Sequence, residues 1–312
     1  MMEKNSSQVA CIVLTHHKPD QLTLLLSALR HPQIRVYLHV DRRASLAPFT
    51  EALSEAGVRD VSLLQRHACA WGSAQLVDAE LEGLARGVED GCGYFVLISG
   101  QDFPMRPVEE ILSFIEKAGS RSYLEHFSLP SPRWRFEGRD RTDFYTYTLL
   151  GRRETCVPRG EDTSFLNRKG LILNEMLRLR STLKPPRRFP SYARPFGGSQ
   201  WWNLSRAAAD HVLGFLDEHP DYRRYHEHTL APDELFFQSI LLGTGFAGHN
   251  ELVDDSLRFM RWSSDESHPR VLGMEDLPAM RESEKLFGRK LDRAVDDTVL
   301  AWLTQRVAGV GS

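Results

Sequence analysis

The sequence has no long apolar run and little net charge, and both absences exclude classes of protein. None of its apolar stretches approaches the ~18 residues that a membrane-spanning helix needs. The 39 Lys and Arg residues are balanced by 42 Asp and Glu residues, so no overall positive field attracts nucleic acid. Residues 1–8 lack the apolar segment of a signal peptide, and we expect a cytoplasmic protein.

Cysteine is scarce. The four residues Cys11, Cys69, Cys92 and Cys156 have spacings that fit neither a zinc site nor a disulfide framework. We therefore expect reduced thiols, which agrees with a cytoplasmic location.

The short motifs of several large enzyme classes are also missing. There is no GxxxxGK[ST], no GxGxxG after the first apolar run, no GxSxG and no HExxH. P-loop, dinucleotide-binding, esterase and zinc-protease functions therefore have no support. A glycosidase needs two carboxyl groups that face each other ~5–9 Å apart. Adjacent Asp233 and Glu234 diverge by about 100° on a helix and do not form that pair.

Alternating strand-like and helix-like segments fill the first 127 residues. Segments of strand length lie at residues 9–15, a continuous apolar run, and at 34–40, 61–64 and 94–99, and helix-like stretches lie at 20–30, 47–56, 73–88 (capped by Ser73) and 108–118. Continuous apolar runs are typical of strands that are covered on both faces. The order predicts an α/β fold with a mostly parallel central sheet flanked by helices.

Ligands of parallel sheets bind beyond the carboxyl ends of the strands. The segments expected there are Thr15-His16-His17, Asp41-Arg42, Trp71-Gly72 and Ser99-Gly100-Gln101-Asp102. They are polar, glycine-rich or aromatic, as a nucleotide cleft requires. Ordinary surface loops are the alternative.

The composition changes between Ser128 and Arg194, where Arg and Pro are frequent and only residues 170–183 resemble a helix. We divide the chain into an α/β half (1–127), an Arg-rich irregular insertion (128–196) and a second half of the same domain (197–312). In this second half we expect helices at 205–216, 276–284 and 298–307 and a strand at 258–262. For the insertion, a lid, a contact with an anionic surface and a solvated basic loop remain open.

Besides the strand ends, the sequence contains a candidate catalytic helix that begins at Pro232, a residue that suits the first turn of a helix. Asp233 and Glu234 follow in that turn, where the free N–H groups and the helix dipole favour negative charge. The residues behind them form an apolar stripe that we expect to be buried: Leu235, Phe236, Ile240 and Leu241. This arrangement pins a carboxylate at a pocket edge, as a general base requires, although two helix-capping acids are the alternative.

A nucleotide-sugar transferase would suit these features. Its diphosphate leaving group needs a divalent metal or cationic side chains. Metal-using enzymes of the GT-A architecture usually have an Asp-x-Asp after a central strand, and the strand ends here offer single acids only. The cations Arg270 and Lys290 are available instead, although each alone is more often a surface charge.

Eight different short motifs lie along the chain between about residue 9 and residue 292. They are Thr15-His-His-Lys18, His39-Val-Asp-Arg42, Ala70-Trp-Gly72, Leu97-Ile-Ser-Gly-Gln-Asp-Phe-Pro104, Gly198-Ser-Gln-Trp-Trp202, Ala231-Pro-Asp-Glu-Leu-Phe236, Ser267-His-Pro-Arg270 and Phe287-Gly-Arg-Lys290. In this order they resemble the core 2/I-branching β-1,6-N-acetylglucosaminyltransferases, a family that includes the peptide O-xylosyltransferases.

The resemblance implies a GT-A-like (Rossmann-like) fold, a UDP-sugar donor, inversion at the anomeric carbon, and no metal or other cofactor. It implies that Glu234 is the general base and that Arg270 and Lys290 neutralise the diphosphate. The residues assigned to the nucleotide are Thr15, His16, Asp41 and Trp71. Those assigned to the donor or acceptor sugar are Ser99, Gly100, Asp102, Glu125, Arg133, Trp134, Gln200, Trp201, Asp233 and Trp262.

Two departures from the family narrow this interpretation. Gln200 stands where the xylosyltransferase branch usually has an acid, which favours N-acetylglucosamine as the donor sugar. The animal members are Golgi-anchored and have several disulfides, whereas this sequence shows neither an anchor-like apolar run nor an evident disulfide pattern. We therefore expect a bacterial cytoplasmic homologue in surface polysaccharide synthesis. Its acceptor would be a glycan hydroxyl, with a lipid-linked glycan left open.

Three alternatives remain open. The first is a UDP-xylose-dependent enzyme. The second is a non-catalytic sugar- or nucleotide-binding homologue, in which Trp201, Trp202 and Trp262 stack on sugar rings. The third, which is compatible with catalysis, is peripheral contact of residues 170–183 with anionic lipid at the inner face of the membrane.

Overall fold

The computed structural model describes residues 8–149, 151–246, 248, 251–262 and 268–308. Its centre is a seven-stranded sheet in the order β10–β6–β9–β4–β1–β2–β3. The strands are β1 (Val9–Thr15), β2 (Ile34–Val40), β3 (Val61–Leu63), β4 (Tyr94–Ser99), β6 (Ser122–Ser128), β9 (Phe196–Ser205) and β10 (Leu252–Val253). Among these strands β9 alone runs antiparallel to its neighbours, so the sheet is mostly parallel, as predicted.

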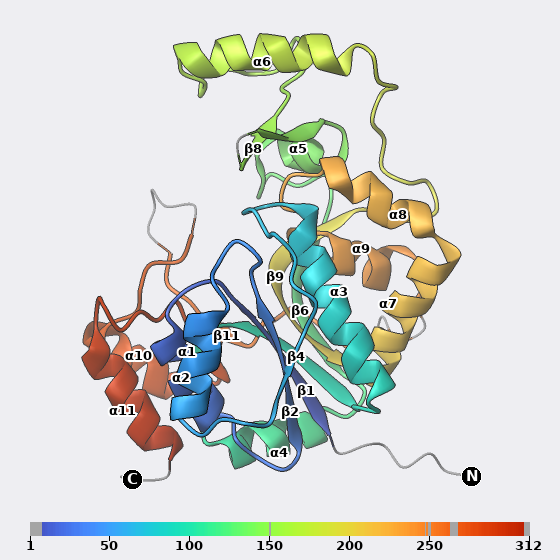
Figure 1. Cartoon of the computed structure of the whole chain (residues 1–312). Coiled ribbons are helices and arrows are strands. Elements are labelled where there is room, and N and C mark those ends of the chain that lie inside the picture. The colour runs from blue at the N-terminus through green and yellow to red at the C-terminus, as the bar shows by residue number, and fades with distance from the viewer. Residues whose placement is uncertain (1–7, 150, 247, 249–250, 263–267, 309–312) are drawn as a thin grey trace.

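Helices cover both faces of this sheet (Figure 1). The odd-numbered residues of β1 pack in one apolar cluster and the even-numbered residues in another, because successive side chains of a strand point to opposite faces. The first cluster includes α1 (Pro19–Ala28), α2 (Ala47–Glu55), α4 (Val108–Ala118) and α11 (Asp297–Val307). The second includes α3 (Ala74–Glu89), α7 (Arg206–Glu218) and α9 (Phe236–Gly243).

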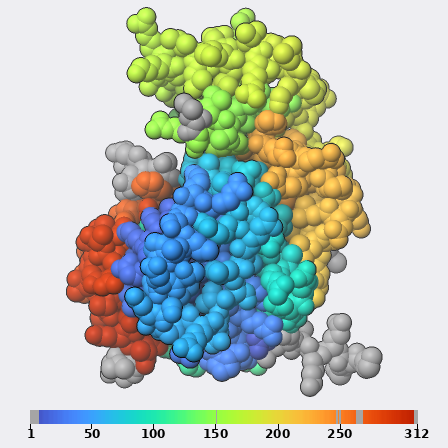
Figure 2. Space-filling view, viewed as in Figure 1, coloured from blue at the N-terminus to red at the C-terminus, as the bar shows by residue number. Residues whose placement is uncertain are grey.

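The Arg-rich insertion leaves the sheet and returns to it at one point, since Ser128 at the end of β6 pairs with Phe196 at the start of β9. The sequence predicted a single helix here, but the structure is more regular. It contains a 3₁₀ turn η1 (Arg135–Gly138), α5 (Arg139–Thr142), a two-stranded ribbon of β7 (Thr146–Leu149) and β8 (Arg152–Thr155), and α6 (Arg168–Ser181). These elements lie at one end of the molecule, outside the central sheet (Figures 1 and 2).

The last part of the chain forms a small sheet in the order β11–β12–β5. Its strands are β11 (Arg258–Phe259), β12 (Phe287–Arg289) and β5 (Asp102–Pro104). The strand predicted at 258–262 is thus too long, because β12 pairs with only its first two residues and Arg261 O accepts a bond from Arg270 N instead. The helix predicted at 276–284 is divided into a 3₁₀ turn η5 (Met274–Asp276) and α10 (Leu277–Glu282).

Two further predictions need correction. Ser73 occupies the N-cap position of α3, but its side chain makes no capping bond. The helix predicted from Pro232 is interrupted: Pro232–Glu234 forms a 3₁₀ turn, η3, and α9 begins only at Phe236. Leu235 separates the two with φ −143°, a value outside the helical range.

All four cysteines are free, as predicted, and all four are buried. In the part of the chain that the structure describes, every helix is too short or too polar to cross a membrane. Residues 1–7 and Ser267 of the Ser267–Arg270 motif lie outside the described residues.

Candidate active site

A cavity of about 260 Å³ lies at the carboxyl ends of the central strands, and we call it the strand-end cavity. Eight of the residues predicted to bind nucleotide or sugar line it: Thr15, His16, Asp41, Trp71, Ser99, Gly100, Gln200 and Trp201. They come from both halves of the chain. The structure therefore brings together the strand ends that the sequence singled out.

The floor of this cavity is tightly built. A Cβ on Gly100 would lie 2.6 Å from Thr15 Oγ1 and 3.2 Å from Thr15 Cβ, so a larger residue there would have to displace the Thr15 side chain. Buried Gln21 of α1 donates to Gly100 O at 3.1 Å and to Leu291 O at 3.0 Å. These bonds tie the C-terminal segment around Leu291 to the ends of the central strands.

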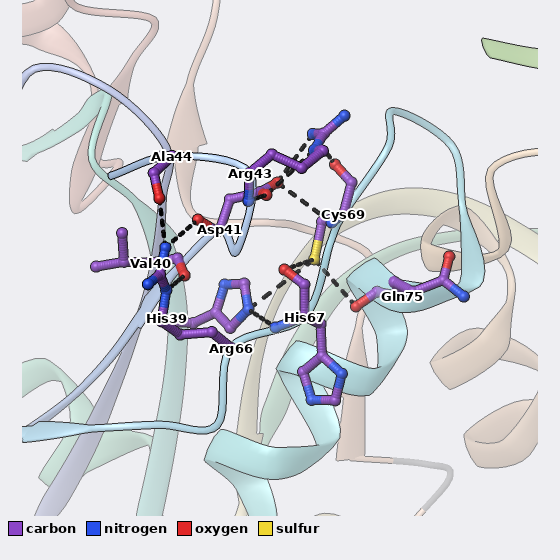
Figure 3. A network of polar contacts seen from close by, with 9 residues as sticks. All are labelled: His39, Val40, Asp41, Arg43, Ala44, Arg66, His67, Cys69 and Gln75. Atoms are coloured by element: carbon purple, nitrogen blue, oxygen red, sulfur yellow. Dashed lines mark hydrogen bonds and ion pairs between the residues drawn. The ribbon is translucent and has the colours of Figure 1, made fainter. Parts of the chain in front are cut away.

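Asp41 at the end of β2 lies in a polar network (Figure 3). Its carboxylate accepts bonds from Arg43 N at 2.8 Å, from the Arg43 guanidinium at 2.9 and 3.1 Å, and from Cys69 N at 3.2 Å. Burial alone would raise the pKa of Asp41, but the bonds from Arg43 and Cys69 outweigh it and lower the pKa. The carboxylate is therefore charged and fixed in position at the cavity wall.

His39, in the same network, is neutral. Its Nε2 accepts a bond from His67 N at 2.9 Å, which requires that this nitrogen carries no proton. Burial and then the neighbouring His67 lower the pKa of His39 to about 4. Arg66 donates to Val40 O and Asp41 O, both at 2.9 Å, and holds the end of β2 against the following loop (Figure 3).

Asp102 does not line the cavity, although the sequence placed it with the sugar-binding residues. It is buried beneath Ser99 and accepts bonds from Ser99 N and Oγ, both at 2.6 Å. Arg289 contacts the same pair, at 2.5 Å from Ser99 Oγ and 3.2 Å from Asp102, and its guanidinium lies 4.2 Å from the centre of the Trp201 ring. Asp102 thus positions Ser99 and Arg289, which both line the cavity.

The η3 turn that carries Glu234 is joined to the cavity wall. Ala231, at φ 45°, donates its N–H to Gly72 O at 3.0 Å, and Gly72 follows the cavity residue Trp71. Gly72 itself has φ 66°, a conformation that favours glycine. The Glu234 side chain is 31% exposed, so its carboxylate is accessible beside the cavity wall without lining the cavity.

Arg141 of the insertion holds Glu234 from the other side. Its guanidinium donates to Glu234 at 2.8 Å and to Asp140 at 3.0 Å, and it lies 3.9 Å from the centre of the Trp134 ring. Trp134 in turn packs against Gly197, where a Cβ would overlap its ring. The predicted sugar-binding residue Trp134 is therefore close to Glu234 through Arg141, a residue that the sequence did not indicate.

Glu80 of α3 and Asp233 of η3 form a buried pair of neighbouring carboxyl groups. Glu80 of α3 is fully buried and accepts bonds from Gln200 at 2.8 Å and Trp202 at 3.4 Å. Burial and then the neighbouring Asp233 raise its pKa well above the usual value. Burial and then Glu234 raise the pKa of Asp233 to about 7, and one carboxyl oxygen of Asp233 is buried without a hydrogen-bond partner. Asp233 is thus a buried neighbour of Glu234 and lines no described cavity.

A second hollow of about 330 Å³, which we call the lateral groove, brings together three predicted acceptor-side residues, Glu125, Arg133 and Trp262. Burial and then Asp254 raise the pKa of Glu125. Trp262 is 59% exposed and offers a face on which a sugar ring can stack.

The two predicted diphosphate-binding cations lie on adjacent segments, since Leu272 N donates to Lys290 O. Arg270 is paired with Asp276 and Glu275 and lines neither the cavity nor the groove. Lys290 is closer to the cavity. Burial is the largest cause of the lowered pKa values of His16 and His17, and the charge of Lys290 contributes to both.

The sequence reasoning did not single out three charged residues of this site. Glu80 left a signal, because an acid on the inward face of an otherwise apolar helix stripe is unusual. Arg289 lies inside a motif that was noted for Lys290. Arg141 left no signal, because nothing local distinguishes it from the other arginines of the insertion.

The fold and the cavity define an α/β protein with a cavity at the carboxyl ends of a mostly parallel sheet, the position at which such sheets usually bind ligands. A family model described as Branch: Core-2/I-Branching enzyme matches residues 9–281. The chain belongs to the Core-2/I-Branching enzyme family, and the predicted GT-A-like fold class and family are confirmed.

Similar proteins include human xylosyltransferase 2, 26% identical over 263 residues, which are 82% of this chain and 27% of that protein. Human xylosyltransferase 1 is 24% identical over 268 residues, 84% of this chain and 25% of that protein. Mouse xylosyltransferase 2 is 26% identical over 270 residues, 82% of this chain and 27% of that protein. The chain thus spans about a quarter of the length of these relatives.

Proposed function

We propose that this protein is an inverting glycosyltransferase that moves a sugar from a UDP-sugar to a hydroxyl of a glycan acceptor without a metal ion. The observation that carries the proposal is the junction of η3 with the cavity. There an accessible carboxylate, Glu234, lies beside a ligand-sized cavity built from strand ends, in a chain of the Core-2/I-Branching enzyme family.

The proposed reaction is a single displacement. Glu234 takes the proton of the acceptor hydroxyl while the acceptor oxygen forms a bond to C1 of the sugar. The bond between C1 and the UDP oxygen breaks on the opposite face, and the electron pair leaves with UDP. Lys290 and Arg270 would neutralise the diphosphate, and we add Arg289 because its guanidinium lines the cavity. Trp71, which is 67% exposed, is the proposed stacking surface for the uracil ring of UDP.

Glu234→Gln tests the catalytic part of this proposal. A positioned general base typically contributes about 10²–10⁴-fold. We therefore expect UDP release in the presence of acceptor to fall by about that factor, whereas UDP binding, measured by calorimetry, stays within about twofold. Exposed Glu227→Gln is the matched control and should turn over normally. Normal turnover of Glu234→Gln would reject the assignment.

The proposal that transfer needs no metal ion is tested with excess EDTA. Turnover should stay unchanged, because basic side chains neutralise the diphosphate in place of a metal. Loss of turnover that manganese restores would overturn that part alone.

The donor sugar separates two candidates. At the position where xylosyltransferases usually have an acid, this chain has Gln200, which donates to Glu80. We propose N-acetylglucosamine as the donor sugar for that reason. The names of the similar xylosyltransferases favour xylose. Turnover with UDP-N-acetylglucosamine and UDP-xylose under equal conditions decides between them. UDP binding without transfer or donor hydrolysis for any UDP-sugar and acceptor tested would favour a non-catalytic binding protein.

A further inference from the structure

α6 has apolar side chains on two sides, and only one side is covered. The inner side is anchored: Asn174 exchanges two bonds with the Val157 backbone at 2.8 and 3.0 Å, and Arg178 donates to Val157 O at 2.8 Å. Leu177 packs with Tyr147 and Cys156 in a small buried cluster. The orientation of α6 is therefore fixed, and its outer side faces away from the rest of the molecule (Figure 1).

The outer side carries a row of exposed apolar side chains. Ile172, Met176, Leu179 and Leu183 are 59%, 65%, 73% and 90% exposed. The spacing of four and three residues places Ile172, Met176 and Leu179 on one face of α6, and Leu183 lies in the turn that follows the end of the helix at Ser181. Of the eleven exposed large apolar side chains in the described part of the chain, six lie between Phe165 and Leu183. Such a concentration marks an interaction surface, whereas single exposed apolar residues need no explanation.

Exposed basic residues lie in and beside α6, namely Arg159, Arg168, Lys169, Arg180 and Arg188. Two other arginines of the segment face inward, since Arg178 anchors α6 and Arg187 is buried. Residues 159–188 together contain eight Lys and Arg and three Asp and Glu, a net charge of +5 in a chain whose net charge is −3. Arg168 and Lys169 lie in the first turn of α6, which has no acidic residue. Positive charge at a helix N-terminus opposes the helix dipole, so these two residues do not serve the stability of α6.

We infer that α6 docks on the surface of an anionic lipid bilayer. Its apolar row enters the boundary between headgroups and acyl chains, and the flanking Lys and Arg side chains contact lipid phosphates. Apolar residues on one face with basic residues beside them are the combination that an interfacial helix uses. A second copy of the chain fits less well, because two α6 helices packed along their apolar rows would bring their basic ends together. The inference stands independently of the proposed glycosyl transfer.

The test measures co-sedimentation of the full chain with vesicles of phosphatidylcholine and phosphatidylglycerol, and with vesicles of phosphatidylcholine alone. We expect binding to the anionic vesicles that weakens in high salt, and at least about tenfold weaker binding to the neutral ones. The apolar part is tested with M176E/L179E. It should bind at least about tenfold more weakly, whereas exposed Leu63→Glu, on β3, should change binding less than about twofold.

The charged part is tested with R168E/K169E against R30E/R59E. Both variants change the net charge equally, but Arg30 and Arg59 lie at the opposite, amino-terminal ends of β2 and β3. Each basic residue at an anionic surface contributes roughly fivefold. R168E/K169E should therefore bind at least about twentyfold more weakly, and R30E/R59E less than about fourfold. Circular dichroism confirms that each variant is folded.

Three outcomes overturn the inference. The first is that the wild-type chain does not bind anionic vesicles at low salt. The second is that each control variant loses as much binding as its α6 counterpart. The third is that light scattering shows a dimer that M176E/L179E abolishes. The last outcome would assign the apolar row to a second copy of the chain.

Discussion

The strand-end cavity and the Arg-rich insertion both contain ion pairs, but the insertion also depends on a buried arginine that binds a group of backbone carbonyls. Around the cavity, Asp41 pairs with Arg43 and Asp102 with Arg289. In the insertion, Arg139 pairs with Glu161, and buried Arg187 donates to the backbone carbonyl groups of Arg141, Thr142 and Phe144 at 2.7, 2.9 and 3.1 Å.

The size of the apolar core explains this difference. The sheet lies between two large buried clusters, whereas the cluster of the insertion has three buried members, Tyr147, Cys156 and Leu177. A segment with so little apolar burial needs polar bonds to fix its backbone. We infer that the sheet and the insertion have separate local stabilities, and that Arg141 reaches Glu234 from the weaker of the two regions.

The largest expected effect comes from Gly198→Ala, where β9 leaves the insertion. A Cβ at Gly198 would overlap the backbone carbonyl of Glu125 at the irregular register of β6 and β9. Because backbone must move, we expect the free energy of unfolding to fall by about 3 kcal/mol or more. Gly214→Ala, in α7 with open space around it, should instead raise it by up to about 1 kcal/mol. Urea unfolding measures both, and equal effects would contradict the proposed clash.

Arg187→Met tests whether the insertion is held by arginine–carbonyl bonds. The change removes a donor from three carbonyl groups, of which Thr142 O keeps its bond from Tyr225 Oη, and we expect it to cost about 2–3 kcal/mol of local stability. Hydrogen exchange should show lost protection at residues 139–187 and unchanged protection in β1 and β4. Exposed Arg188→Met is the control and should leave both regions unchanged. Equal loss of protection in the sheet would show that the two regions unfold together.

The sequence predicts the sheet region well, because its signals are local. β1 and β4 appear as nearly continuous apolar runs, and β1, β2, β4 and α4 all have the predicted bounds. Residues at strand ends could be grouped because topology alone brings such ends together.

The remaining features depend on contacts between distant segments. The pairing of β9 between β4 and β6 brings residues 196–205 into the sheet across the whole insertion, and no local periodicity encodes it. The same holds for Arg141 beside Glu234 and Gln200 beside Glu80. The β7–β8 ribbon was missed because its strands are short and largely polar. Local patterns predict which segments are regular, but tertiary packing selects which charges meet.

The smallest expected effect concerns Asp233, which departs from the pairing seen elsewhere around the cavity because one of its buried oxygens has no partner. Burial and the neighbouring Glu234 raise its folded-state pKa to about 7, from 3.8 for an unperturbed Asp. The folded protein then binds more protons than the unfolded chain between these values. Its stability therefore falls as pH rises through this window, and the cost is fully present above about pH 7.

Asp233→Asn removes this titration and keeps the shape of the side chain. At about pH 4 the variant should match the wild type, and at about pH 8 it should be more stable by about 1–3 kcal/mol. Urea unfolding across this range measures the difference, and exposed Asp217→Asn should show no such trend. A constant difference between Asp233→Asn and the wild type would mean that Asp233 stays ionised in the folded protein. The pairing of charges around the cavity would then extend to Asp233, with Arg141 as the nearby cation whose charge favours the ionised form.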